Sequence, residues 1–503
     1  MTSLHDIMNR LNRFSQSWRT LQQSLPLLWL ARHPLFALGL MSLPLYLAVL
    51  IHGDFRPSRM ESFFPIFLGL FAFYGAACWL VIKRRAGGSL STIFLFAIGF
   101  NALLIPSWPT LSDDMFRYIW DGRVQAAGIN PYRYASNAAE LTYLRDDLIW
   151  SNINRPRAVT IYPPGAQIVF AATWRVFPDS VVGMKLVMVA ATLLAGWLLV
   201  KLLRALNQPP ERVLIFLWNP LLMFEVAHAA HADALYLPLI VGAFLLRAHS
   251  PSDRVSWRHE AGIGILLGLA TLIKLYPAML VIPLWSLRDE SGKRRWRLAL
   301  PIATVLTVLI GYAFYIQPGV NALGFLPTYG REFFNVSPLM HWLTDLAMAH
   351  RIQWYTPGNI GMPFLVAIIS LWMVISPARE GRQTILRCFW PIGIYLLINH
   401  NLFSWYALWL LPLIALDLFV SRHSRFNMAL AWWVFTGTVA LSYTFFIRWR
   451  EEQWAVQLQF WPLYILLVAA AITRIRQWLS TPQFSIPLDD ELHSEHEPST
   501  LKL

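Results

Sequence analysis

The chain has 503 residues, of which 56% are hydrophobic and only 14% are charged, whereas about 25% are charged in ordinary soluble domains. With 24 Trp, 31 Phe and 17 Tyr, this excludes a soluble enzyme, a disordered protein and a coiled coil. Repeated apolar runs of about 20 residues indicate an all-α polytopic membrane protein. The net charge of +13 is typical of basic cytoplasmic loops, so we expect no nucleic-acid partner.

The chain begins with a polar segment that precedes the first apolar run. Residues 1–33 carry Arg10, Arg13 and Arg19 between apolar positions, which predicts an amphipathic helix on the cytoplasmic face of the membrane. A flexible arm is the alternative. Because the first apolar run begins only near Leu27, the segment does not have the pattern of a cleavable signal.

Apolar length predicts the spans of a transmembrane domain over residues 34–476, and Lys and Arg predict their orientation. The expected spans are 34–52, 63–82, 90–107, 180–203, 211–227, 231–248, 260–287, 297–316, 360–376, 388–401, 404–420, 427–447 and 457–474. We expect 12 to 14 transmembrane helices in a plasma (inner) membrane, with both termini in the cytoplasm. Residues 108–163 and 317–359 form two long external loops, and the acidic tail 477–503 is cytoplasmic and disordered.

Two apolar stretches do not fit a simple span. Residues 161–177 are short and begin with Tyr162-Pro163-Pro164-Gly165, which predicts a re-entrant or interfacial helix. Basic loops flank both ends of 260–287, so we expect a break at Lys274-Leu275-Tyr276-Pro277, where proline interrupts the helix.

The charged residues of the first external loop concentrate in one short segment. Asp114, Arg117, Tyr118 and Asp121 have helical i, i+3, i+4, i+7 spacing, after a capping Ser112 and before a stop at Gly128-Ile129-Asn130-Pro131. Such a stripe is either a solvated face of an interfacial helix or a carboxylate held at the membrane surface to take a proton from a hydroxyl. The spacing leaves both interpretations open.

The motifs resemble a known enzyme group. The run SDDMFRYIWDGRVQAAGINPYRY with the later IYPPGAQ, HAAHADAL, IKLYP and FSWYALWLLPL blocks is similar to polyprenol-phosphate-sugar-dependent glycosyltransferases of the GT-C fold, in the mannosyltransferase-like branch called family 87. The resemblance covers about Trp108 to Leu413. It implies a GT-C-like helix bundle whose first long extracytoplasmic loop, 108–163, is catalytic.

The resemblance also implies a chemistry for this loop. In these enzymes a carboxylate of this loop is catalytic, and the resemblance matches it to Asp114 or Asp113 of this sequence. Asp114 is favoured as the general base for the acceptor hydroxyl. The leaving phosphate requires cations, and direct attack would invert the anomeric centre. The residues expected to hold the donor phosphate and sugar are Arg117, Tyr118, Asp121, Arg123, His231, Asp233, Lys274 and Tyr276. A divalent ion, Mg or Mn, is conceivable at Asp113 and Asp114, and we expect no other metal or certain cofactor.

Several of these residues have an alternative structural role. Lys274 lies in an apolar run, where it either serves the donor or reaches the interface. His228, His231 and Asp233 form an H-x-x-H-x-D cluster that could bind zinc, bond within the core or place the donor, and Glu225 could be the partner of His228. The residues with an acceptor-binding role are expected to be Tyr162, Arg331, Glu332, His400, Trp405 and Tyr406, with Tyr329 and His341 beside them in the second loop.

The expected function is therefore transfer of a hexosyl group, with mannosyl favoured, from a polyprenyl-phosphate sugar to a hydroxyl of a glycan, glycolipid or other acceptor. Membrane lipids are the other expected partners. The alternatives are a transporter or flippase of lipid-linked sugars, and a glycan transferase similar to O-antigen ligases. A transporter favours charges within spans, of which the sequence has few, and internal repeats, of which it has none.

Overall fold

The computed structural model describes residues 29–30, 32–83, 89–249, 256–285, 297–329, 337–350, 357–376, 378, 381–399, 401–420, 427–446 and 457–480. Most of the predicted N-terminal amphipathic segment and of the acidic tail lies outside these ranges.

The described residues fold into helices, without a β-strand. The longer α-helices are α3 (Pro34–His52), α4 (Phe63–Ile82), α5 (Leu90–Leu104), α8 (Val181–Ala205), α11 (Asp233–Ala248), α12 (Trp257–Thr271), α14 (Ala299–Ala313), α17 (Pro357–Ile375), α19 (Phe389–Ile398), α21 (Met428–Thr438) and α23 (Trp461–Ser480). The shorter α-helices are α6 (Asp114–Ala126), α7 (Pro164–Val176), α9 (Leu214–Leu217), α10 (Pro220–Met223), α13 (Val281–Trp285), α15 (Leu326–Tyr329), α16 (Pro338–Ala349), α18 (Gly381–Arg387) and α20 (Leu411–Asp417). One π-helical turn, η5 (Phe224–His228), and 3₁₀ segments complete the fold: η1 (Pro57–Ser62), η2 (Ala139–Leu144), η3 (Trp150–Asn152), η4 (Pro210–Val213), η6 (Tyr276–Leu280), η7 (Gly319–Leu323), η8 (Ser404–Leu410) and η9 (Val439–Phe446).

The helices confirm an apolar all-α membrane protein, and α3 and α4 have the predicted bounds. Within the described residues, three helices are long and apolar enough to cross a membrane by themselves: Pro34–His52, Arg59–Ile82 and Val181–Ala205. The number of spans stays a prediction.

The expectation of one continuous helix over 211–227 is wrong. Asn219-Pro220 divides it, because proline donates no backbone hydrogen bond and the Asn219 side chain instead accepts from the Leu221 amide at 2.9 Å. The 404–420 and 427–447 runs likewise divide into a 3₁₀ segment and an α-helix each.

The short α7 and the interrupted 260–287 run meet each other. Helix α7 has 13 residues, fewer than the roughly 20 of a spanning helix. Helix α12 ends at Thr271, and 3₁₀ structure begins at Tyr276, so the break falls where the sequence predicts it. The amides of Gly165 and Ala166, at the start of α7, donate to the Leu272 carbonyl at 2.8 and 3.1 Å.

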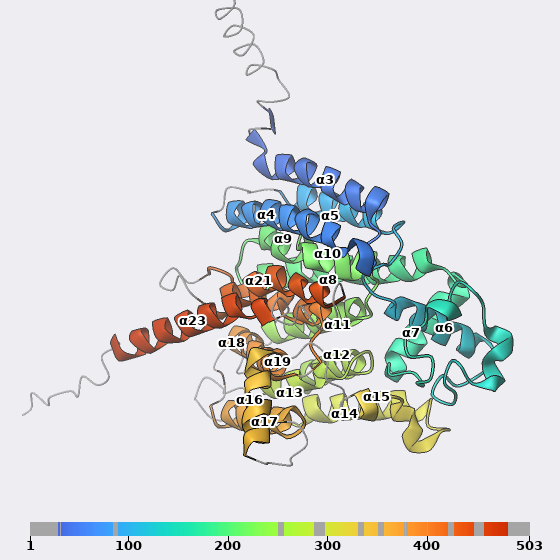
Figure 1. Cartoon of the computed structure of the whole chain (residues 1–503). Helices are drawn as coiled ribbons and strands as arrows, with labels where there is room; N and C mark the ends of the chain where they lie inside the picture. The colour runs from blue at the N-terminus through green and yellow to red at the C-terminus, as the bar shows by residue number, and fades with distance from the viewer. Residues whose placement is uncertain are drawn as a thin grey trace, which may run out of the picture.

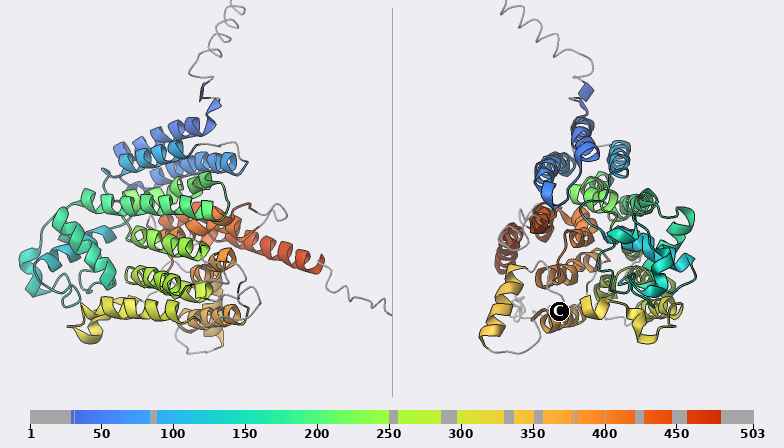
Figure 2. Two further views of the ribbon diagram at one scale, coloured as in Figure 1. Left: turned by 180° about the vertical axis from the view of Figure 1, so that it is seen from behind. Right: turned by 45° about the vertical axis from the view of Figure 1, so that its right-hand side comes forward.

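Helices α3, α4, α8, α11, α12 and α14 run side by side in nearly the same direction (Figure 1). Helices α6 and α7, in cyan and green, lie together at one end of this bundle, and the view from behind shows the same arrangement (Figure 2). The loop after α14 reaches this end, because the Tyr315 hydroxyl donates to Gln125 Oε1 at 2.8 Å. One end of the bundle therefore gathers the first predicted external loop and the start of the second, where the Phe325 amide donates to the Thr160 carbonyl at 3.0 Å.

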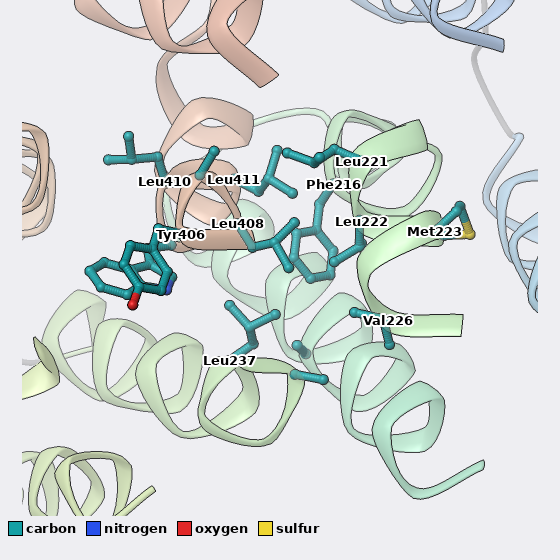
Figure 3. Close-up of a cluster of buried hydrophobic side chains, with 14 of the residues drawn as sticks. Phe216, Leu221, Leu222, Met223, Val226, Leu237, Tyr406, Leu408, Leu410 and Leu411 are labelled. Carbon is teal, nitrogen blue, oxygen red and sulfur yellow. The ribbon is translucent and has the colours of Figure 1, made fainter. Parts of the chain in front are cut away.

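A buried hydrophobic cluster joins η5 and η8 to α10 and α11 (Figure 3). Leu221, Leu222 and Val226 face Leu408, Leu411 and Leu237 there, and all six are at most 1% exposed. Because protein interiors are closely packed, this cluster fixes the positions of Glu225 on one segment and Tyr406 on the other.

Candidate active site

A cavity of about 560 Å³ opens at the end of the bundle that carries α6 and α7. Its wall combines the α6 N-terminus, the loop 152–163, the helix break at 273–276, the segment 325–329 and η8. The charged lining residues are Arg56, Asp113, Asp114, Arg117, Arg155 and Lys274. The sequence-predicted Tyr162, Tyr276, Trp405 and Tyr406 line the same cavity, so segments far apart in the sequence meet there.

The two carboxylates stand where α6 begins. Asp113 is the N-cap residue and Asp114 is the first helical residue, and the helix dipole favours negative charge at this position. The Ser112 hydroxyl accepts a hydrogen bond from the Asp114 amide at 3.3 Å, in keeping with the predicted capping segment. Gly128, with φ of 78°, ends the segment in the left-handed conformation that glycine adopts readily.

Asn154 holds the two carboxylates together. Its amide nitrogen donates to Asp113 Oδ1 and to Asp114 Oδ1, each at 2.7 Å. Partial burial and, second, the charge of Asp114 raise the pKa of Asp113 to about 6, although the Asn154 hydrogen bond favours its ionised form.

This arrangement does not fit a metal ion between the carboxylates. The Asn154 amide group contacts both of them from the position that a bridging cation would need. The part of the chain that the structure describes also has no group of three His, Cys, Asp or Glu side chains placed to hold a metal ion.

The predicted polar stripe of α6 faces protein rather than solvent. Arg117 and Asp121 are 5% and 1% exposed, and Arg117 Nε donates to Asp121 Oδ1 at 2.9 Å. Gln167 Nε2 donates to Asp121 Oδ2 at 2.8 Å. Tyr118 is buried and stacks on Phe170, with 4.6 Å between ring centroids. Only Asp114 and Arg117 of the stripe line the cavity, so the solvated-face interpretation is wrong.

Arg123 lies apart from the cavity. Its guanidinium donates to Asp146 and Asp179 at 2.8 to 3.0 Å, and to the Leu144 carbonyl at 2.8 Å. These contacts tie the end of α6 to the loops around it. The structure thus places Arg123 in an internal ion-pair network and does not bring it to Asp114.

Lys274 reaches the cavity from the helix break. Its ammonium lies 2.8 and 2.9 Å from the two Asp233 oxygens and 4.3 Å from the Tyr406 ring centroid. Asp233 also accepts from Trp409 Nε1 at 2.7 Å and from the Tyr236 hydroxyl at 2.6 Å. Asp233 is 2% exposed, so it positions Lys274 from behind the cavity wall.

Aromatic rings form the wall beside Lys274. Tyr276 stacks on Trp409 with centroids 3.7 Å apart and an interplanar angle of 3°. The Tyr329 hydroxyl lies 3.1 Å from the Tyr406 hydroxyl. Flat rings beside a cation and carboxylates suit the apolar faces and hydroxyls of a sugar.

The structure separates the two histidines of the H-x-x-H-x-D cluster. His228 Nδ1 lies 2.8 Å from the Ser107 hydroxyl and its Nε2 lies 3.2 Å from that of Thr110. Glu225 does not pair with His228 as expected. The π-helical turn η5 instead directs Glu225 to His231, with 3.3 Å between Oε2 and Nε2.

Three predicted acceptor residues, Arg331, Glu332 and His400, lie outside the described residues, and His341 lies on α16 away from the cavity wall. Sequence reasoning missed Asn154 and Arg155. Arg155 lies over the rings of Phe325 and Tyr329, at 5.5 and 5.7 Å from their centroids. The only sequence signal for these two residues is their place in the predicted external loop 108–163.

Comparison with known proteins points to mannosyltransferases. Residues 45–288 match the model of the family described as alpha-(1->6)-mannopyranosyltransferase, N-terminal domain. The chain is also 23% identical over 370 residues to alpha-(1->6)-mannopyranosyltransferase A of Mycobacterium tuberculosis, covering 67% of this chain and 68% of the relative. No solved structure matches.

The matched range contains the α6 N-terminus, the loop 152–163 and the break at Lys274, which supply three of the cavity walls. These matches support a glycosyltransferase enzyme similar to mannosyltransferases, and the apolar helices support a membrane protein.

Proposed function

We propose that the protein transfers a mannosyl group from a polyprenyl-phosphate sugar to an acceptor hydroxyl on the extracytoplasmic side of the membrane, with inversion at the anomeric carbon. The observation that carries the proposal is the cavity in which Asp113 and Asp114 face the same space as Arg117 and Lys274. The descriptions of the matched family and of the similar mycobacterial protein support mannose as the sugar.

Asp114 is the proposed general base. It is the half-buried member of the pair, and it begins a rigid helix whose dipole stabilises the carboxylate. Asn154 fixes its Oδ1 at 2.7 Å, which leaves Oδ2 to take the proton of the attacking hydroxyl. A positioned base accelerates such a transfer by about 10²–10⁴-fold.

The reaction also requires positive charge near the leaving phosphate. When the anomeric C–O bond breaks, its electrons stay on the phosphate, whose second pKa is about 6 in phosphomonoesters, so the phosphate leaves without an acid. Lys274 and Arg117 line the same cavity, and we place the phosphate near them. Both cations are already paired with a buried carboxylate, Asp233 or Asp121, which holds them in place before the charge develops.

The charges at the two ends of the bundle support an extracytoplasmic cavity. Helix α8 begins beside α7 near the cavity and ends with Lys201 and Arg204 at the far end of the bundle. Lys and Arg collect on the cytoplasmic side. The cavity therefore lies at the opposite, extracytoplasmic membrane surface in this proposal, where it suits a donor that is linked to a lipid.

The test measures sugar transfer from a labelled polyprenyl-phosphate mannose in membranes that contain the protein. We expect Asp114→Asn to lower the rate by about 10²–10⁴-fold, because the amide cannot take the proton. Asp113→Asn should lower it less, since its carbonyl still accepts from Asn154. The matched control is Asp147→Asn, an exposed residue of the same loop that does not line the cavity and should retain the wild-type rate.

Wild-type transfer by both Asp113→Asn and Asp114→Asn would show that neither carboxylate is the base. If the wild-type protein transfers no sugar from any such donor but moves a solute, the transporter alternative is correct.

A further inference from the structure

His231 lies between two carboxylates behind the cavity wall. Its Nδ1 is 3.8 Å from Asp114 Oδ2, and its Nε2 is 3.3 Å from Glu225 Oε2. His231 and Glu225 are both fully buried. The two oxygens of Asp114 thus have different neighbours, because Oδ1 accepts from Asn154 and Oδ2 faces His231.

Both ring nitrogens of His231, and Glu225 Oε2, lack a hydrogen bond of good geometry. Buried polar atoms almost always have a partner, so three neighbouring atoms without one are unusual. Unpaired buried groups cost stability and persist where they serve function. Hydrogen bonds of catalytic groups are often long without substrate and shorten when it binds.

The surroundings hold the imidazole in this position. Its ring stacks on Trp405, with centroids 3.8 Å apart and an interplanar angle of 22°. Ala230 precedes it with φ of 58°, and the His231 amide donates to the Glu225 carbonyl at 2.9 Å. The left-handed residue reverses the chain after η5, so that His231 returns to the side chain of Glu225.

Glu225 is itself oriented from behind. The Tyr443 hydroxyl donates to Glu225 Oε1 at 2.7 Å and accepts from the Ser404 hydroxyl at 3.1 Å. Oε1 is therefore occupied, and Oε2 points to His231. A carboxylate in this position selects the tautomer with hydrogen on Nε2, which leaves the Nδ1 lone pair directed at Asp114.

We propose that His231 is a positioning residue that takes over the proton from Asp114. The proposal rests on the proposed function. As the acceptor oxygen bonds to the anomeric carbon, its O–H bond breaks and the proton moves to Asp114 Oδ2, while the electrons of the anomeric C–O bond leave on the phosphate. The proton then passes to His231 Nδ1, and Nε2–H stays directed at Glu225. The imidazolium formed lies between two carboxylates, which stabilise it.

The proton transfer to His231 leaves Asp114 ionised again after each sugar transfer. Asp114 regains its charge as soon as the proton reaches His231, and the proton later returns through Asp114 to water in the cavity. The charged and titratable groups around the ring are Asp113 and Asp114 on α6, Tyr118 on the same helix, Glu225 on η5, Tyr443 on η9 and the Asp233–Lys274 pair. Because several charged groups surround the ring, the test compares rate constants and ring signals at one pH.

The first measurement is steady-state transfer by the full-length protein with His231→Gln and Glu225→Gln. We expect His231→Gln to lower kcat by about 10–100-fold while the KM for the donor changes less than about threefold, because His231 does not contact the cavity. Glu225→Gln should lower kcat by about tenfold. The matched control is His228→Gln, a second buried histidine with hydroxyl partners, and its kcat should stay within about threefold of wild type.

The second measurement does not depend on activity. The ring nitrogens are observed by NMR in protein labelled with ¹⁵N-histidine, and the signal missing from His231→Gln identifies His231. We expect Asp114→Asn and Glu225→Gln each to shift this signal and to leave that of His228 unchanged. Unchanged His231 signals in both variants would overturn the relay, as would a kcat of His231→Gln equal to wild type.

The two measurements separate the proposals. If the wild-type protein transfers no sugar, the proposed function fails, and the NMR comparison still decides whether His231 couples Asp114 to Glu225. A proportional rise in KM and fall in kcat, with unshifted ring signals, would show that His231 only supports the fold.

Discussion

At the scale of single residues, the site keeps its charges paired. Lys274 and Arg117 each contact a carboxylate that is almost fully buried, Asp233 or Asp121. Asp113 and Asp114 share the amide of Asn154. Breaking a buried pair by removing one partner leaves an uncompensated charge, so variants of Asp121 or Asp233 test stability before they test catalysis.

The pKa of Asp113 gives a prediction at this scale. Its carboxyl titrates near pH 6, first because it is partly desolvated and second because Asp114 is negative. Asp114→Asn removes the second cause only, so the pKa of Asp113 should fall below 6 and remain above 3.8. Infrared titration of protein with ¹³C-labelled aspartate measures it, with Asp113→Asn to identify the band.

The raised pKa of Asp113 determines how its contribution to stability changes with pH. Between about pH 4 and pH 6 the folded protein retains a proton that the unfolded chain releases, so this group's contribution to stability is lost as the pH rises through about 6. A pKa of Asp113 that is unchanged in Asp114→Asn would contradict coupling between the two carboxylates.

At the scale of elements, the site depends on the junction of α7 with the end of α12. Gly165 approaches Leu272 so closely that a Cβ at this position would lie 2.9 Å from both the Leu272 carbonyl oxygen and its Cβ. The carbonyl of Leu272 has no partner in its own interrupted helix, and the first amides of α7 supply one. Lys274 follows two residues later, so this contact sets the position of the cation.

We therefore expect Gly165→Ala to displace α7 from the break. The close carbonyl oxygen of Leu272 belongs to the backbone, which cannot move cheaply, and overpacking of this kind costs about 1–3 kcal/mol. Thermal unfolding in detergent should show a lower Tm, and transfer activity should fall because Lys274 moves.

Gly99→Ala is the control for this prediction. Gly99 is also helical, and a Cβ there would meet nothing within 4 Å, so the exchange should leave the Tm equal or raise it, in line with the higher helix propensity of alanine. Equal Tm values for the Gly165 and Gly99 variants would contradict the junction as a rigid contact.

At the scale of the whole molecule, the cavity and the basic C-terminal end of α8 lie at opposite ends of the bundle. The cavity, α6 and α7 occupy one end of the bundle, and Lys201 and Arg204 end α8 at the other (Figure 1). This polarity is what the sequence predicts from basic loops, and it can be measured directly.

Cysteine labelling tests the orientation. Cys78 and Cys388 are buried, so neither should react with a maleimide. Tyr143→Cys, at a residue 70% exposed in the cavity-side loop, should react with a membrane-impermeant maleimide in intact cells. Arg204→Cys should react only after the membrane is opened. The reverse pattern would place the cavity in the cytoplasm.

How much the sequence reveals differs between the elements. Helices α3 and α4 follow directly from apolar length, because a helix that satisfies all its own backbone groups can form whatever its neighbours are. The break at 272–275 follows from proline. The division of 211–227 at Asn219 does not follow from hydropathy, since all of its pieces are apolar.

By itself, the sequence determines an all-α membrane protein and a helix that begins at Asp113-Asp114, and it indicates a sugar-transferring chemistry through its motifs. Only the tertiary structure decides which residues share the cavity. Asn154, Lys274 and Trp405 share the cavity with Asp114 through packing of loops and interrupted helices that no local periodicity encodes. The same packing moves Arg123 into an ion-pair network and turns Glu225 toward His231, because each buried charge must find its partner in three dimensions.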